Sequence, residues 1–157
     1  MLRGKWKYVV IVMLSAITTV LFSSNFFKNG VRVEFDAQSE LPVDYQMFYI
    51  TDGEEFGEEK SIHVRGRGRF EREHIEMIIV SEDVSKIRLD FGTGLNHIIV
   101  KNFKINRESI NLQKLFTTDT MHQIDDVVVN DGMVSLKTST EDPLVIVPFR
   151  IKASLSR

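Results

Sequence analysis

The spacing of apolar residues changes abruptly near residue 28, and no other feature of the sequence constrains the fold as strongly. Residues 8–22 form an uncharged, mostly apolar run that follows three cations near the N-terminus. From residue 31 onward, apolar residues alternate with polar ones in several segments. Such alternation is typical of β-strands that turn one face to a core and the other to water. The sequence therefore predicts an apolar helix within residues 1–28 and an all-β domain over residues 29–157.

The apolar run is long enough to cross a bilayer once it is extended to residue 27. A helix over residues 8–27 measures about 30 Å, which matches the hydrocarbon core of a membrane. The preceding cations, Arg3, Lys5 and Lys7, place the N-terminus in the cytoplasm by the positive-inside rule. We therefore expect a single-pass protein of the cell membrane. Its signal-anchor would contact the lipid bilayer, and its C-terminal domain would be extracytoplasmic.

Two other interpretations of this segment stay open. A cleaved signal peptide has the same charged start and apolar centre, but it also needs small residues one and three positions before the cleavage point. Ser23 would pair with Leu21 in those positions, and Ser24 with Phe22, so neither choice is favourable. The second alternative is a buried helix of a soluble protein.

Composition excludes several classes of function. The chain has a formal net charge of -2, but its first 28 residues hold four cations and no acid, which leaves 16 basic against 22 acidic residues. An acidic domain is a poor partner for nucleic acid phosphates, so we expect no nucleic-acid binding. The absence of cysteine excludes disulfides, thiol catalysis and cysteine-ligated metals.

Strand-like segments recur along the outer domain without clear helices between them. Turn sequences separate these segments, most clearly Asn130-Asp131-Gly132, which predicts a tight hairpin. Short strands in this number favour an all-β sandwich of the jelly-roll or galactose-binding-like kind, with a closed barrel as the alternative. The predicted strands cover residues 31–36, 45–50, 61–65, 74–80, 86–91, 97–105, 124–129, 133–137 and 144–151.

Three positions within this pattern carry more specific expectations. Pro148 cannot donate a ladder hydrogen bond, so the last strand is expected at a sheet edge or with a bulge. Residues 109–116 fit either a short helix or irregular structure. Asp90 follows Arg88 by two residues in a regular strand, so we expect it to pair with Arg88 or to hold the turn at residues 92–94.

Short motifs along the outer domain resemble a known family. They are Tyr45-Gln-Met-Phe-Tyr49 with Phe56-Gly-Glu-Glu59, Lys86-Ile-Arg-Leu-Asp-Phe-Gly92 with Ile98-Ile-Val-Lys-Asn-Phe-Lys-Ile105, and Asn130-Asp-Gly132 with Glu141-Asp-Pro143. In this order they resemble the extracytoplasmic β-sandwich of bacterial multi-spanning membrane proteins of cell-surface polysaccharide synthesis and sugar transfer. The resemblance covers roughly residues 31–151. This chain shows no second apolar run, so the resemblance implies a sandwich on a single anchor, either a stand-alone accessory or a fragment.

Arg65, Arg67 and Arg69 form the one basic cluster of the outer domain. Guanidinium groups bind phosphate and carboxylate groups in a two-pronged geometry, so the cluster is a candidate site for a polymer or a lipid headgroup. The alternating glycines also fit a simple soluble turn. A third possibility is that the arginines pair with the acidic loop that precedes them.

That acidic loop is a candidate calcium site. Asp52, Glu54 and Glu55 lie close together, with Glu58 and Glu59 just beyond, and calcium prefers such oxygen ligands. The spacing does not match an EF-hand, and a solvated turn is the alternative. The four histidines show no metal-binding spacing, so we expect no histidine-ligated metal and no obligatory cofactor.

Aromatic side chains are scarce for a sugar-binding surface. The candidates for stacking on a sugar ring are Tyr49 and Phe56. Tyr45 and Tyr49 share a predicted strand face with Met47, however, and this favours a place in the core. No nucleophile motif occurs, and no catalytic residue is predicted.

Together these features predict a membrane-anchored, non-enzymatic β-sandwich that binds or positions a cell-surface glycan, a lipid-linked precursor or a membrane partner. The glycan version rests mainly on the family resemblance. The alternatives are a purely structural or protein-interaction module and, with less support, a glycan-processing enzyme.

Overall fold

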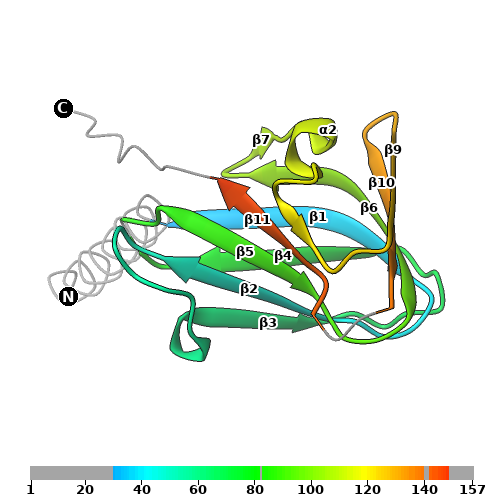
Figure 1. Cartoon of the computed structure of the whole chain (residues 1–157), viewed down its shortest axis with the longest axis horizontal. Helices are drawn as coiled ribbons and strands as arrows, with labels where there is room; N and C mark the ends of the chain where they lie inside the picture. The colour runs from blue at the N-terminus through cyan, green and yellow to red at the C-terminus, as the bar shows by residue number, and fades with distance from the viewer. Residues whose placement is uncertain (1–29, 82, 140–141, 149–157) are drawn as a thin grey trace, which may run out of the picture. The chain divides into compact units, whose positions relative to one another are not determined.

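The computed structural model describes residues 30–81, 83–139 and 142–148, which form two antiparallel sheets packed face to face (Figure 1). The predicted β-sandwich is therefore confirmed. The predicted membrane segment, residues 1–28, lies outside the described residues. Within the described ranges, no helix has the length and apolar character needed to span a membrane.

The first sheet, sheet A, follows the order β4-β1-β6-β10-β9, and the short β7 extends it from β6. The second, sheet B, follows the order β3-β2-β5-β11-β8. The elements of sheet A are β1 (Val31–Ser39), β4 (Glu73–Ile79), β6 (Asn96–Ile105), β7 (Glu108–Ser109), β9 (Asp126–Asn130) and β10 (Met133–Thr138). Those of sheet B are β2 (Asp44–Ile50), β3 (Ser61–Arg65), β5 (Lys86–Phe91), β8 (Met121–His122) and β11 (Leu144–Pro148), and the helical turns are η1 (Glu58–Lys60) and α2 (Leu112–Leu115).

All nine predicted strands are present. The bounds of β3 and β5 match the predicted ranges 61–65 and 86–91, and the ends of the others differ by up to three residues where the structure describes them. The hairpin at Asn130 is confirmed, since Asn130 pairs with Met133 across the turn and Asp131 and Gly132 have the positive φ values of 42° and 72° that this turn requires. Residues 109–116 divide between the end of β7 and the short helix α2.

The expected position of the last strand needs a correction. β11 is not a simple edge, because the two-residue strand β8 pairs with its first residues, Leu144 and Val145. Pro148 lies beyond that short partner and opposite Lys86 of β5. The missing N–H of Pro148 therefore falls where β8 no longer pairs with β11.

The core between the sheets is built from the inward residues of each alternating strand. Phe35 of sheet A stacks on Phe103 at 5.6 Å between ring centroids and meets the edge of Tyr45 of sheet B at 5.5 Å. Tyr45 and Met47 are fully buried, so their predicted place in the core is confirmed. These aromatic contacts join the two sheets directly.

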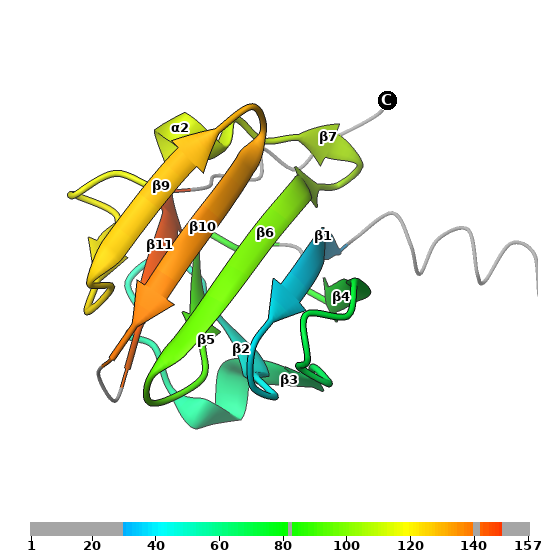
Figure 2. The same cartoon turned by 90° about the vertical axis from the view of Figure 1, so that its right-hand side faces the viewer.

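Three loops meet at one end of the sandwich, which we call the loop end: residues 40–43, 66–72 and 92–95. Figure 2 shows the connections that follow β1 and β5 at its lower side. Backbone hydrogen bonds hold the loops together, from Gly66 N–H to the Val43 carbonyl at 2.7 Å and from Arg69 N–H to the Glu40 carbonyl at 2.9 Å.

Replacement of Phe35 should destabilise the sandwich strongly. Phe35→Ala removes a fully buried ring that contacts both sheets, so we expect the free energy of unfolding to fall by about 3–5 kcal/mol. Leu95→Ala is the control, since Leu95 is 74% exposed and its loss should change stability by less than about 0.5 kcal/mol. Urea denaturation of the full chain measures both, and equal losses would contradict the assigned core.

Candidate functional site

The loop end carries a polar hollow of about 320 Å³, which we call the carboxylate pocket. It lies over the outer face of sheet B, where β2, β5 and β11 are neighbours. Residues at its rim include Thr93 and Asn96. The side chains that give it its chemistry are Asp44, Gln46, Arg65, Asp90 and Asp142.

Arg88 joins two of these carboxylates. Its Nε and one terminal nitrogen donate to the two oxygens of Asp90, at 2.8 and 2.6 Å, and the same terminal nitrogen donates to Asp142 at 2.8 and 2.9 Å. The predicted pairing of Asp90 with Arg88 is thus confirmed. Asp142 was not foreseen as its second partner. The Asp90 side chain is only 9% exposed, whereas that of Asp142 is 49% exposed.

The alternation of the strands explains why these groups meet. Leu89 and Phe91 point into the core, so Arg88 and Asp90 must point to the outer face of β5. The register places Phe48 of β2 opposite Arg88, and the guanidinium lies over the Phe48 ring at 4.9 Å. This cation–π contact holds the guanidinium against the sheet.

Burial changes the acidity of this cluster. Burial and, to a smaller extent, the neighbouring Asp142 carboxylate together raise the pKa of Asp90 to about 6, because they outweigh the lowering effect of the pairing with Arg88. The pKa of Arg88 is also raised, because its two carboxylates favour the charged guanidinium more than its burial opposes it. The cluster therefore holds one fixed cation, Arg88, beside a buried carboxyl, Asp90, whose pKa is raised.

A second hollow of about 330 Å³ lies beside the first, between β3 and β4 and the loop of residues 66–72; we call it the arginine hollow. Two of the predicted site residues, Arg65 and Arg67, line it, and Arg65 also lines the carboxylate pocket. Arg69 lines neither hollow. The arginine hollow is also lined by Glu71, Arg72, Glu73 and His74.

The loop of residues 66–72 has a defined backbone. Both oxygens of Glu73 accept the backbone N–H of Arg67 at 2.9 Å, and the Phe70 N–H donates to the Ser39 carbonyl at 2.7 Å. Gly68 has a φ of 79°, and a Cβ placed on it would lie 2.6 Å from the backbone of Leu41 and Pro42. A glycine is therefore required for the loop to approach its neighbour so closely.

The acidic loop does not contribute to either hollow. Glu54 forms an ion pair with Lys60 and accepts the Thr51 N–H at 3.0 Å, and Glu58 accepts a hydrogen bond from Gln46 at 2.8 Å. The alternative in which this loop pairs with the arginines is wrong, because the two segments lie at opposite ends of β3. In the part of the chain that the structure describes, no three acidic or histidine side chains converge as a metal site, and calcium at Asp52, Glu54 and Glu55 stays a prediction.

The predicted stacking aromatics also lie elsewhere. Tyr49 packs half-buried against the core, Phe56 is half-buried in the acidic loop, and neither lines a hollow of the loop end. The exposed aromatic of the loop end is Phe70, which is 45% exposed and meets the ring of His97 edge-on at 5.8 Å. Phe70 was not predicted as a site residue. The sequence signal that could have identified it is a single phenylalanine within a polar, glycine-containing loop.

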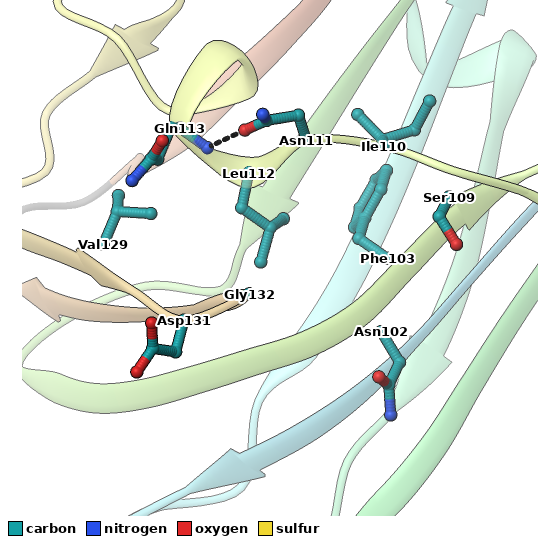
Figure 3. Close-up of a pocket in the computed structure, with 10 residues that line it drawn as sticks. All are labelled: Asn102, Phe103, Ser109, Ile110, Asn111, Leu112, Gln113, Val129, Asp131 and Gly132. Atoms are coloured by element: carbon teal, nitrogen blue, oxygen red, sulfur yellow. Dashed lines mark hydrogen bonds between the residues drawn. The ribbon is translucent and has the colours of Figure 1, made fainter.

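A third hollow, of about 500 Å³, lies beside α2 (Figure 3). Phe103, Leu112 and Val129 give it an apolar lining, and polar side chains such as Asn111 and Asp131 surround them. The Asn111 side chain caps α2 by accepting the Gln113 N–H at 2.9 Å. Because Asp131 is its only titratable side chain among the described residues, the loop end remains the stronger candidate site.

The raised pKa of Asp90 predicts a specific dependence of stability on pH. The ordinary pKa of 3.8 becomes about 6 on folding, so the folded protein binds more protons than the unfolded chain between about pH 4 and pH 6. The contribution of Asp90 is therefore most favourable below about pH 4 and is lost as the pH rises through about 6. Asp90→Asn should remove this slope, as measured by thermal unfolding from pH 4 to 7.

Asp36→Asn is the control for this experiment. Burial raises the pKa of Asp36, but hydrogen bonds from Arg72, Asn102 and His74 outweigh burial and lower it to about 2. Its contribution to stability is present above about pH 4 and is lost as the pH falls toward about 2. Asp36→Asn should therefore leave the pH dependence of stability between pH 4 and 6 unchanged. Loss of this pH dependence in Asp36→Asn would contradict its assignment to Asp90.

The close approach of Gly68 can be tested against Gly94, which has a similar φ of 85° but no neighbouring atom within 4 Å of the position that a Cβ would occupy. Alanine at either position costs about 1–2 kcal/mol for the left-handed backbone. Gly68→Ala should cost at least about 1 kcal/mol more, since its Cβ meets the backbone of Leu41 and Pro42. Chemical denaturation compares the two variants, and equal losses would contradict the contact.

Comparisons with known proteins do not identify a family for this chain. No family model, curated protein or solved structure matches the chain. The resemblance to the extracytoplasmic sandwich of polysaccharide-synthesis proteins therefore stays a prediction. The chemistry of the loop end is the basis on which a function can be assigned.

Proposed function

We propose that this protein is a non-enzymatic, extracytoplasmic β-sandwich, tethered to the membrane by residues 1–28, that binds a cell-surface glycan in the carboxylate pocket. The observation that carries the proposal is the convergence of Asp44, Gln46, Asp90 and Asp142 in one hollow beside Arg65. These groups come from β2, β3, β5 and the segment before β11, and the pairing of the strands holds those on the sheet at fixed positions.

The side chains of the pocket suit neutral sugar hydroxyls. A hydroxyl donates to a carboxylate and accepts from an amide or a guanidinium, and such charge-assisted bonds are stronger than neutral ones. Arg88 already orients Asp90 and Asp142 through bonds of 2.6–2.9 Å. A ligand would therefore meet carboxylates that are ordered in advance, which lowers the entropic cost of binding.

The same geometry supports a binding role over hydrolysis. A glycosidase needs one carboxyl to act as an acid and another to act as a base or nucleophile, placed on either side of the scissile bond. Here Asp90 and Asp142 both contact a single nitrogen of Arg88. They stand side by side on one cation, an arrangement suited to accepting hydrogen bonds.

We also assign the sandwich to the jelly-roll or galactose-binding-like class, which the repeated passage of the chain between the sheets supports.

A protein-interaction module is the second candidate, and one observation favours it. β9 is the outer strand of sheet A, and Val128 on it is 54% exposed. An edge strand offers unpaired backbone groups to an added strand from a partner.

Asp142→Asn tests the glycan proposal. The full chain in detergent is first applied to a glycan array, and a bound glycan is then titrated by calorimetry. Loss of the Asp142 charge should weaken binding about tenfold or more, because an ionised acceptor is replaced by a neutral amide.

Asp126→Asn is the matched control, since Asp126 is an exposed aspartate of β9 on the other sheet, and its replacement should leave the affinity unchanged. Binding of no glycan, or equal weakening by both variants, would overturn the proposal. Recovery of a membrane protein through β9 without glycan binding would support the interaction module instead.

A further inference from the structure

We propose that the glycan is anionic and that Arg65 and Arg67, in the arginine hollow, bind its negatively charged groups. This inference rests on the proposed glycan function and names the class of glycan. The chemistry concerned is an oxyanion carried on a sugar chain, whether a uronate carboxylate, a sulfate or a phosphate.

The first observation is that these guanidiniums are not neutralised. Across the described residues, Arg65, Arg67 and Arg69 take part in no ion pair. Other arginines of the sandwich are paired, as Arg72 is with Asp36 at 2.7 Å and Arg88 is with Asp90 at 2.6 Å. An unpaired guanidinium keeps all its donors available for a ligand.

The acidic residues of the hollow are partly engaged by other groups. Glu73 directs both oxygens to the backbone N–H of Arg67, and Asp36 nearby accepts from Arg72, Asn102 and His74. Glu71 is exposed on the loop. The guanidiniums of Arg65 and Arg67 are therefore the groups of this hollow that remain open to an anion.

The loop presents Arg67 from a fixed backbone. Its N–H is bound by Glu73 at 2.9 Å, and the next residue, Gly68, lies against the backbone of Leu41 and Pro42. A guanidinium on such a support can bind a carboxylate, sulfate or phosphate through two parallel hydrogen bonds. Lysine in its place would offer a point charge without this geometry.

Arg65 connects the two sites. It lies opposite Asp44 in the register of β3 and β2, and it lines both the carboxylate pocket and the arginine hollow. One extended glycan can therefore place hydroxyls among the carboxylates and its charged group between Arg65 and Arg67. Repulsion from Asp44, Asp90 and Asp142 would be reduced, because the anion would be bound in the arginine hollow, which none of the three lines.

The test compares polygalacturonate with its fully methyl-esterified form, in which each carboxylate is replaced by an uncharged methyl ester on the same sugar chain. The full chain in detergent should bind polygalacturonate at least about tenfold more tightly at low ionic strength. Raising the salt concentration should reduce this preference, since screening weakens contacts between exposed charges. Inorganic sulfate and phosphate are added as competitors to rank the oxyanions.

Arg67→Gln is the decisive variant, because Arg67 lines the arginine hollow but not the carboxylate pocket. It should lower the preference for the charged polymer about tenfold. Arg107→Gln is the matched control, since it removes the same charge from an exposed position between β6 and β7, and it should leave the preference unchanged.

The possible outcomes distinguish a failure of the anionic-ligand inference from a failure of the proposed glycan binding. Equal binding of the two polymers, or a preference that Arg67→Gln does not alter, would overturn the anionic ligand and leave glycan binding in place. Binding of neither polymer, together with an empty glycan array, would overturn both. Binding to phosphatidylglycerol vesicles but to neither polymer would identify the arginines as a lipid contact and would also overturn the inference.

Discussion

A chain of aromatic contacts across the core fixes the geometry on which the rest of the molecule depends. Phe35 and Phe103 stack within sheet A, Phe35 meets Tyr45 of sheet B at 5.5 Å, and Tyr45 meets Phe91 at 6.4 Å. The last ring contact, from Phe91 to Phe116, ties in the segment after α2. These rings set how the sheets face one another. Because side chains alternate along a strand, the neighbours of these inward rings point to the outer face.

The outer face of sheet B holds charged groups, Arg88 and Asp90, that are partly withdrawn from water, and this desolvation costs free energy. Desolvation offsets much of the attraction between a guanidinium and carboxylates that are withdrawn from water. Burial, with a smaller contribution from the Asp142 carboxylate, outweighs the pairing with Arg88 and raises the pKa of Asp90 to about 6. The cluster is therefore better understood as a source of fixed geometry than as a source of stability. Its more exposed member is Asp142, whose side chain is 49% exposed although both of its oxygens accept hydrogen bonds from Arg88.

Local features of the sequence predicted most of the fold. Alternation located the strands, and the Asn130-Asp131-Gly132 turn located a hairpin, because each signal depends on neighbouring residues only. The pairing of Arg88 with Asp90 was predictable for the same reason, since the two residues are separated by one position on one strand face. β8 was not predicted, as a strand of two residues has no period.

The candidate site was predictable only in part, because its residues are brought together by strand order. Arg65 and Arg67 were identified from composition, and both line a hollow. Asp142 meets Arg88 across 54 positions of sequence, and no local pattern reports such a contact. The expected pairing of the arginines with the acidic loop failed because β3 keeps the two segments apart. The membrane helix lies outside the described residues and stays a prediction.

The backbone of residues 69 and 70 has a broader implication. Arg69 and Phe70 adopt consecutive left-handed conformations, with φ values of 63° and 55°, and each costs on the order of 1 kcal/mol or more. Hydrogen bonds to Glu40 and Ser39 hold this backbone in place from the neighbouring loop and strand end. The strain is confined to a surface segment, outside the stacked rings of the core. Changes at residues 69 and 70 should therefore alter the surface of the loop end while the packing of the core beneath it is preserved.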